Sequence, residues 1–272
     1  MSYVQVIQTG TTLVSPAVPD RRTRKWDKAY TGLFQRRSTR IEVPVKAFLV
    51  ETAGRLTLVD AGWSIQAATH PLKHMGFGLW FASEPVLKEE EAVSRQLEKL
   101  GIAPEDLDAI VFTHLDCDHV SGIDTLRTAR RILVSPQEYA ASQRKDVRYR
   151  PSFWDGVTFE ELDFVFDDRS PFQQSCDIYG DGSVVAHFTP GHSKGSVALV
   201  ATDVETGRFV VLAGDDGYSE KSWDELALPG PMVDASEMTR TLKWVRELRS
   251  DERCAGVFAA HDPAVAPGVY EF

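Results

Sequence analysis

The chain has 272 residues, of which 43% are hydrophobic and 26% charged, as is ordinary for a globular protein with a substantial core. A formal net charge of −10 argues against general nucleic-acid binding. No apolar run approaches the roughly 18 residues of a membrane span, and the first ten residues lack a basic region followed by an apolar stretch. We therefore expect a cytoplasmic protein that binds neither nucleic acid nor membrane.

The N-terminal part differs from the rest in charge. Residues 1–272 are expected to form one domain, in which residues 1–44 make an N-terminal arm plus an edge strand. Residues 4–8 alternate weakly and predict that strand. Residues 20–40 are irregular and basic, and two interpretations stay open. They form either a solvated arm or a cationic rim that attracts an anionic substrate or a partner surface. Within the chain, the acidic run 155–168 is the candidate partner for these basic residues, referred to below as the internal mate.

Two runs of β-branched and apolar residues, 45–51 and 55–60, are separated by Thr-Ala-Gly and predict a hairpin. This hairpin would bring Asp60 to the end of a strand. The segment 63–85 carries large apolar side chains such as Trp80 but too many glycines for a stable helix, so we predict a loop. Such a loop either packs on the core or lines an apolar pocket near the functional site.

Apolar periodicity predicts a helix over 88–100, ended by Gly101, and then a buried strand over 107–112. The further expected elements are helix 121–129, strand 131–134, a short helix beginning near Pro136, strands 161–166, 184–189, 197–201 and 209–213, an amphipathic helix 236–248, and a last strand 256–259. The mixture of strands and helices indicates an α/β protein.

The stretch after strand 107–112 is the most informative in the chain. It reads Thr-His-Leu-Asp-Cys-Asp-His over residues 113–119. Four polar side chains of this kind cannot all face a core without unpaired polar groups, and Asp and His are depleted in strands. A loop at the carboxyl end of the strand would aim them at one point. The pattern therefore predicts a metal site.

The three cysteines are Cys117, Cys176 and Cys254, and they form no close-spaced pair. Their odd number leaves one without a partner in any disulfide scheme, which favours reduced thiols. Although Cys117 lies between two candidate ligands, we expect it to be a small buried thiol and not a ligand.

The metal-ligand stretch resembles the His-x-His-x-Asp-His signature of the metallo-β-lactamase superfamily, with Asp116 in place of the second histidine. The superfamily's other motifs follow in its order, with Asp60 in Val-Asp-Ala-Gly, His192 in Thr-Pro-Gly-His-Ser, Asp215 in Ala-Gly-Asp-Asp and His261 in Ala-Ala-His. In layout the chain is most similar to the quorum-quenching N-acyl homoserine lactone lactonases. The resemblance implies a four-layer αββα sandwich.

The resemblance also implies a centre of two metal ions about 3.5 to 4 Å apart with open coordination positions. One carboxylate would bridge the two metal ions. The resemblance favours Asp215 for this role, and the adjacent Asp216 is the alternative. Asp60 is implied to orient the metal ligands by hydrogen bonds. On the superfamily's pattern one metal would be bound by His114, Asp116 and His192, the other by Asp118, His119 and His261, and Asp215 would bridge them.

Two residues are implied to act in catalysis. Asp118 would help to hold the nucleophile. Tyr218 follows Asp215 by three residues, the offset at which lactonases of the superfamily place a tyrosine that polarises or protonates the substrate oxygen. Packing alone is the alternative role for Tyr218. His70, His74 and His187 fall outside the motifs, and we expect His187 to be structural.

The implied function is a dinuclear metal-dependent hydrolase, in which a bridging hydroxide opens a lactone or cleaves an ester or thioester. The substrate would be a small molecule with an apolar portion, and the oligomer considered is a homodimer. The two divalent metal ions would be zinc, or iron or manganese. Asp116 favours iron or manganese, because an added carboxylate lowers the net charge of the centre.

Asp116 also opens two alternative functions. Flavodiiron proteins carry a carboxylate at this position, which suggests a diiron oxidoreductase that handles oxygen or nitric oxide. A binding protein with a degraded metal site is the other alternative.

Overall fold

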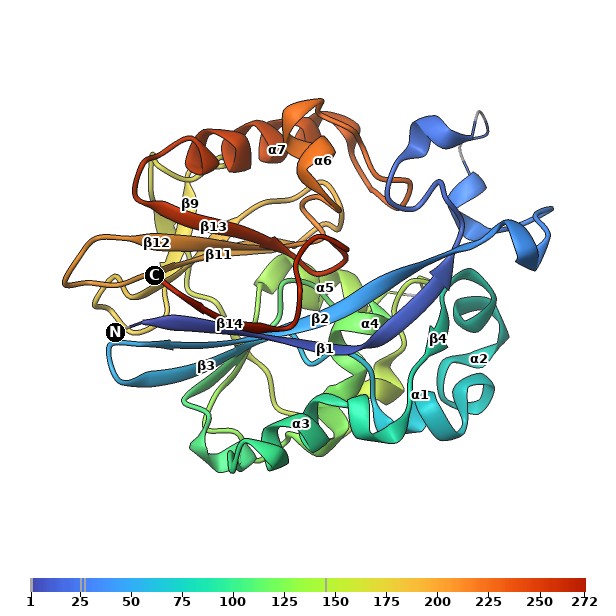
Figure 1. Cartoon of the computed structure of the whole chain (residues 1–272), viewed down its shortest axis with the longest axis horizontal. Helices are drawn as coiled ribbons and strands as arrows, with labels where there is room; N and C mark the ends of the chain where they lie inside the picture. Colours follow the sequence, from blue (N-terminus) through green and yellow to red (C-terminus); the bar gives the residue numbers. More distant parts are fainter. Residues whose placement is uncertain (1, 25, 27, 145) are drawn as a thin grey trace.

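The structure is a computed structural model that describes residues 2–24, 26, 28–144 and 146–272. In this part of the chain the strands form two sheets that lie face to face (Figure 1). The first sheet has the order β14 (Gly268–Glu271), β1 (Tyr3–Val14), β2 (Ile41–Thr52), β3 (Arg55–Val59), β5 (Ala109–Val111), β6 (Ile132–Val134) and β7 (Glu160–Glu161), with β4 (Glu84–Val86) paired to β1. The second has the order β13 (Cys254–Ala259), β12 (Phe209–Gly214), β11 (Val197–Thr202), β10 (Val184–Phe188), β9 (Gln174–Asp177) and β8 (Val165–Phe166).

Helices cover the outer face of each sheet (Figure 1). A buried apolar cluster lies between the two sheets, and one further cluster lies under each helical layer. The four-layer αββα sandwich expected from the sequence is therefore confirmed. The first sheet is covered by α1 (Ile65–Thr69), α2 (Pro71–Ala82), α3 (Val93–Lys99), α4 (Cys117–Val120) and α5 (Pro136–Ser142), and the second by α6 (Glu220–Asp224) and α7 (Ala235–Arg249).

Helix α7 illustrates how local sequence produces this packing. Asp234 caps its first turn by accepting hydrogen bonds from the amides of Ser236 and Glu237. Met238, Leu242 and Val245 recur at helical spacing and are fully buried against the second sheet. A helix was predicted over 236–248, and the structure confirms it to within one residue at each end.

Strand β1 differs from its prediction in length and in place. It covers Tyr3–Val14 and lies between β14 and β2, so it is an interior strand of the sheet and not an edge strand. The reason is β14, which the sequence analysis missed. That strand is half exposed and only four residues long, and so it gives little apolar periodicity.

The basic segment 20–40 contains three short 3-10 turns, η1 (Arg21–Thr23), η2 (Ala29–Thr31) and η3 (Arg37–Thr39). The ion pairs of Arg22 and Arg37 do not involve the acidic run 155–168 that was predicted as the internal mate. Arg22 pairs with Glu225 and Arg37 with Glu84, whereas the acidic run 155–168 lies against other parts of the chain, including Arg131. The guanidinium of Arg40 lies 4.7 Å from the ring centre of Phe81, which attaches the segment to α2.

The segment 63–85 was predicted as a loop, and this prediction was wrong because tertiary packing outweighed its glycine content. It forms α1 and α2. Ser64 caps α1 through the amide of Gln66, and Pro71 occupies the first turn of α2. Gly76 interrupts α2 with a φ of 73°, so the glycine marks a kink between two helical turns and not the absence of a helix.

Three other boundaries changed. Residues 161–166 do not form one strand but contribute β7 to the first sheet and β8 to the second. In place of helix 121–129 the chain forms α4 and then η6 (Ser121–Thr125). The helix predicted over 88–100 is η4 (Glu89–Glu91) followed by α3, with Gly101 just beyond its end at a φ of 74°, as expected. The remaining short turns are η5 (Pro104–Asp106) and η7 (Pro151–Phe153).

No helix in the described residues is both long enough and apolar enough to cross a membrane.

Candidate metal centre

The motif residues meet because the strands before them end at one edge of the sandwich. Strands β3 and β5 are parallel neighbours, and so are β12 and β13. Asp60 directly follows β3, and the 113–119 stretch follows β5. Asp215 and His261 stand just beyond β12 and β13, and His192 lies in the loop after β10. Carboxyl ends of parallel strands share an edge, which brings these distant segments together.

Six of the predicted ligands fall into two groups. The candidate donor atoms within each group lie within 4.8 Å of one another. The first ligand group is His114, His192 and Asp215, and the second ligand group is Asp118, His119 and His261.

Asp215 reaches both groups. Its Oδ1 lies 3.1 Å from His119 Nε2 and 3.2 Å from His261 Nε2, whereas its Oδ2 lies 3.5 Å from His192 Nε2. One oxygen thus faces each group, which is the arrangement that a bridging carboxylate requires. Burial, with Asp215 next to it, raises the pKa of the neighbouring Asp216 well above its usual range, which suits a neutral carboxyl and not a metal ligand.

The histidine rings are oriented so that their Nε2 atoms converge. His261 donates from Nδ1 to the carbonyl of Pro44 at 2.7 Å. His119 Nδ1 lies 2.8 Å from Asp60 Oδ2, and His114 Nδ1 lies 3.0 Å from Thr113 Oγ1. With Nδ1 occupied in this way, Nε2 carries the free lone pair. His114 Nε2 and Asp215 Oδ1 are buried without a hydrogen-bond partner, so this set of imidazoles and carboxylates fits divalent zinc, iron or manganese.

Asp60 fixes the start of the stretch after β5 by hydrogen bonds. It is fully buried, its backbone lies in the left-handed region at a φ of 60°, and its carboxylate accepts from the amide and the hydroxyl of Thr113, each at 2.8 Å. The same carboxylate also accepts a hydrogen bond from His119 Nδ1. Asp60 therefore fixes the orientation of His119, a candidate ligand, without being a member of either group, and this contact fits the orienting role that the resemblance implies.

Glu138 is a second buried carboxylate of this kind, and the sequence analysis missed it. It accepts from the amide of Leu115 at 3.0 Å, the hydroxyl of Ser193 at 2.7 Å and the amide of Gly195 at 3.1 Å. It thereby ties the loop that carries His114 to the loop that carries His192. In the sequence it is an ordinary acidic residue in the first turn of α5, with no signal that sets it apart.

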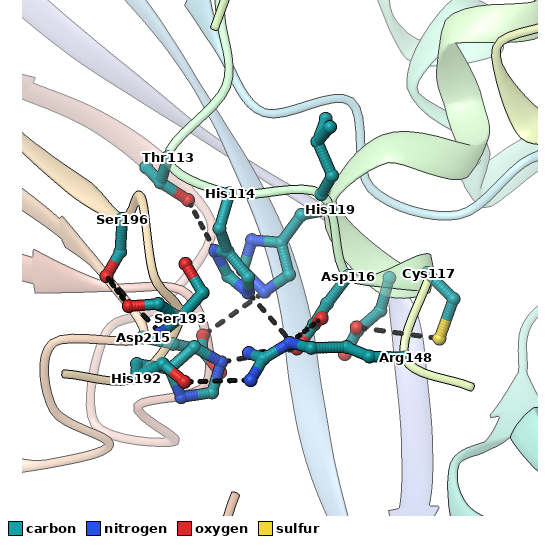
Figure 2. A network of polar contacts seen from close by, with 12 residues as sticks. Thr113, His114, Asp116, Cys117, His119, Arg148, His192, Ser193, Ser196 and Asp215 are labelled. Atoms are coloured by element: carbon teal, nitrogen blue, oxygen red, sulfur yellow. Dashed lines mark hydrogen bonds and ion pairs between the residues drawn. The ribbon is translucent and has the colours of Figure 1, made fainter. Parts of the chain in front are cut away.

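Arg148 is the other residue that the sequence analysis missed. Its guanidinium forms a two-point ion pair with Asp116, and its third nitrogen donates to the carbonyl of His192 at 2.8 Å (Figure 2). Burial opposes the charge of Asp116, but Arg148 and His114 outweigh it and hold the pKa of that carboxyl well below its usual range. Asp116 is thus the one predicted ligand outside the two groups, although its Oδ2 lies 3.4 Å from His114 Nε2 and 3.2 Å from His192 Nε2.

Tyr218 lies at the same centre. Its hydroxyl donates to Asp215 Oδ2, and its ring stacks on His261 with 5.2 Å between the ring centres. Burial and the nearby Asp215 raise the pKa of Tyr218 well above its usual range, so the phenol stays protonated and remains a hydrogen donor.

A cavity of about 600 Å³ opens onto these residues. Asp116, Asp118, Asp215, Tyr218 and His261 form its polar end. Its walls are mainly apolar and come from the N-terminal segment, β2, α2 and the stretch before α7, with Val14, Val18, Tyr30, Leu33, Val43, Phe77, Leu79, Phe81, Met232 and Val233. The interpretation of segment 63–85 as a pocket wall therefore holds for these residues of α2, while Trp80 packs, partly buried, against the core under the first sheet.

His187 and Cys117 have the buried surroundings that the sequence predicted. His187 is buried with its ring 5.0 Å from that of Trp244, and His74 packs on Phe153. All three cysteines are free, and Cys117 is buried.

Comparison with known proteins gives the same family as the motifs. The family model described as the metallo-beta-lactamase superfamily matches residues 40–256. The N-acyl homoserine lactonase AttM of Azorhizobium caulinodans is 30% identical over 245 residues, which cover 85% of this chain and 88% of that protein.

Solved structures have the same fold. An N-acyl homoserine lactone hydrolase with the product N-hexanoyl-L-homoserine at its catalytic metal centre matches with a TM-score of 0.73 and 22% identity, over 96% of this chain and 93% of that one. A dizinc quorum-quenching lactonase, also with an N-hexanoyl homoserine product, matches with a TM-score of 0.63 and 16% identity, over 99% and 93% of the two chains.

Proposed function

The chain belongs to the metallo-beta-lactamase superfamily, and we propose that it is a metal-dependent lactonase whose substrates are N-acyl homoserine lactones. The observation that carries the proposal is the meeting of two ligand groups and a protonated tyrosine at the polar end of a mainly apolar cavity. Relatives named N-acyl homoserine lactonases support lactone hydrolysis as the reaction. The acyl homoserine lactone as substrate is the finer inference, because it joins a polar ring to an apolar chain.

Superfamily membership and the two ligand groups support two divalent metal ions. When bound, they would polarise the carbonyl of the substrate and acidify a water molecule. We assign the first site to His114, Asp116 and His192, the second site to Asp118, His119 and His261, and the shared position to Asp215. The first site goes beyond the first ligand group, since it includes Asp116. Its support is the single oxygen, Oδ2, that faces both imidazoles.

The chain's own residues have distinct tasks in ring opening. Water adds to the lactone carbonyl, the bond from that carbon to the ring oxygen breaks, and the ring oxygen leaves as a hydroxyl. Asp118 lines the cavity and holds the attacking water by accepting its hydrogen bond. Tyr218 donates its phenol hydrogen to the oxygen on which charge develops. The apolar walls take up the acyl chain and exclude bulk water from the polar end.

The alternative functions are not favoured. The relatives are named lactonases, which gives no support to a diiron oxidoreductase. A degraded metal site is hard to reconcile with seven candidate ligands whose donor atoms converge on one region. We propose in addition that residues 1–272 form a single domain and that the protein forms a homodimer. The metal is proposed to be zinc, iron or manganese. The pairing of β14 with β1 supports the single domain, since it joins the two ends of the chain.

The experiment that tests the function combines metal analysis with a substrate panel. Protein purified without added metal is analysed for zinc, iron and manganese and then assayed with N-acyl homoserine lactones of short, medium and long acyl chains, simple lactones, aryl esters and thioesters. We expect each acyl homoserine lactone to gain the mass of one water molecule and to release one proton per turnover. Chelator-treated protein is the control. A fully metal-loaded protein that opens no lactone would overturn the proposal.

A further inference from the structure

The ion pair between Arg148 and Asp116 sits where the superfamily's signature has a second histidine. We propose that Arg148 is a positioning residue for the first metal site, and that the Asp116–Arg148 pair together takes the place of that histidine. The inference rests on the metal centre assigned above but not on the identity of the substrate.

The geometry fixes which oxygen of Asp116 is offered to a metal. Arg148 Nε donates to Oδ1 at 2.5 Å and Nη2 donates to Oδ2 at 2.8 Å (Figure 2). Both oxygens thus accept from the guanidinium, but Oδ2 is also the oxygen near both imidazoles of the first ligand group, at 3.4 Å from His114 Nε2 and 3.2 Å from His192 Nε2. A planar guanidinium in two-point contact holds a carboxylate in one orientation. Arg148 therefore leaves Oδ2 as a single, oriented ligand atom, as one imidazole nitrogen would be.

The same guanidinium restrains a second ligand. Its bond to the carbonyl of His192 connects the segment around residue 148 to the loop after β10. Asp116 and His192 thus share one support, and both side chains of the ion pair are largely buried, with 17% exposure for Arg148 and 19% for Asp116. Loss of Arg148 is expected to loosen both ligands, and loss of Asp116 is expected to leave a largely buried cation without its partner.

The pair also changes the charge of the centre. A neutral histidine would add nothing, Asp116 alone would add one negative charge, and the guanidinium cancels that charge. The preference for iron or manganese was predicted from the negative charge of Asp116 alone. Because Arg148 cancels that charge, the preference loses its basis. With the pair intact, the centre has the same formal charge as one with a neutral histidine at residue 116, and zinc suits it equally well.

A cycle of two substitutions tests the inference through metal binding alone. Metal-free protein is titrated with zinc against a chromophoric chelator, and folding is checked by circular dichroism. We expect the wild type to bind two zinc ions. Asp116→His alone should bind one, because Arg148 then places an unpaired positive charge beside the first site. Adding Arg148→Met to Asp116→His should restore two. If Asp116→His alone binds two zinc ions as tightly as the double variant does, the inference is wrong.

Two further variants keep the test decisive if Asp116→His fails to fold. Arg148→Met should lower the preference for zinc over manganese at least tenfold relative to the wild type, since Asp116 is then uncompensated. Arg148→Lys keeps the charge but not the two-point contact, and it should weaken the first site while leaving that preference unchanged. The matched control is Arg130→Met, which breaks an exposed ion pair to Asp108, at the opposite end of β5 from the metal centre. An unchanged preference in Arg148→Met would overturn the inference, whatever the protein's activity on lactones.

Discussion

Tyr218 donates its hydroxyl hydrogen to Asp215, the carboxylate whose two oxygens face the two ligand groups. The tyrosine is therefore coupled to the centre before any substrate arrives. A substrate oxygen that enters the polar end of the cavity would compete with Asp215 for the same hydrogen. The hydroxyl and the ring of Tyr218 thus have different contacts, since the ring stacks on His261. A catalytic role would belong to the hydroxyl, and a packing role to the ring.

Tyr218→Phe keeps the stacked ring and removes only the hydroxyl. We expect the turnover number on an acyl homoserine lactone to fall about tenfold to a hundredfold while KM changes by less than about threefold, because the hydroxyl stabilises charge that develops in the transition state. Steady-state kinetics on protein of known metal content measures this. An unchanged turnover number would reduce Tyr218 to packing, and a loss of metal would mean that it acts through Asp215.

Removal of a ligand should remove metal without unfolding the chain. His192→Ala, His119→Ala and Asp215→Ala are each expected to lose most of the metal at the affected site and nearly all hydrolysis, since the core is built elsewhere. Metal analysis and circular dichroism of the purified variants test this together. The matched control is His74→Ala, a half-buried histidine outside the centre, which should keep full metal content. Full metal content with wild-type turnover in any one of the three would refute the ligand set.

The apolar wall should select for acyl chain length. Phe81→Ala removes a large side chain from the cavity, so KM should rise about tenfold for long-chain substrates and change little for short ones. Trp80→Ala is the control on the same helix, because Trp80 packs against the core and should affect stability more than chain-length preference. Kinetic constants over a series of acyl chains give the answer. Equal effects of Phe81→Ala on short and long chains would exclude this wall as the chain site.

The meeting of the candidate ligands, and of Asp60 beside them, could be predicted because these residues follow strands that the sequence reveals. Strand 107–112 is an apolar run, and the polar stretch after it must lie at the carboxyl end of that strand. The same holds for Asp60 and Asp215. Neighbouring parallel strands end at a common edge of the sheet, and this brings the residues that follow them together. The order of the motifs, matched to the superfamily, supplied the partition into two sites that local sequence could not.

Arg148 and Glu138 could not be predicted in this way. Arg148 acts on Asp116 across 32 residues of chain, from a segment without periodicity, so nothing local marks it. The helices of segment 63–85 were also not predicted. Glycine lowers helix propensity there, but Met75 is fully buried in the core and Leu79 packs against it, and this packing outweighs the propensity. Both misses come from contacts between segments distant in sequence.

His187 gives the stability of the fold a pH dependence that is independent of metal. Burial lowers its pKa to about 4, below the ordinary value of about 6.5 in an unfolded chain. Between these values the unfolded chain takes up a proton that the folded protein does not, so the free energy of unfolding falls as the pH drops. We expect His187 to contribute about 2 kcal/mol of this loss between about pH 7 and pH 4.5.

The check is denaturant unfolding of metal-free wild type and His187→Phe at both pH values. Phenylalanine keeps the contact with Trp244 and cannot titrate, so the loss of stability on acidification should be smaller by the amount given above. Metal-free protein is needed because acid also releases metal. Parallel losses in the two proteins would show that the His187 pKa is not lowered.

Asp60 allows orientation of a ligand to be separated from ligation itself. Its carboxylate accepts three hydrogen bonds, two from Thr113 and one from His119 Nδ1. Asparagine tolerates the left-handed backbone of this position, so Asp60→Asn should leave the path of the chain unchanged. The amide, however, has one acceptor oxygen and one donor NH₂ group, and it cannot accept on both sides.

In either orientation of the amide the support of His119 is damaged. If NH₂ faces His119, Nδ1 must become the acceptor and the proton moves to Nε2, the atom aimed at the metal. If the oxygen faces His119, NH₂ opposes the amide hydrogen of Thr113 and displaces the stretch that carries the ligands. We therefore expect Asp60→Asn to weaken the second site about tenfold to a hundredfold and the first site by a smaller factor, because only His119 of the second site contacts Asp60 directly. Zinc titration resolves the two binding steps, and a second step of wild-type affinity in the variant would show that His119 needs no support from Asp60.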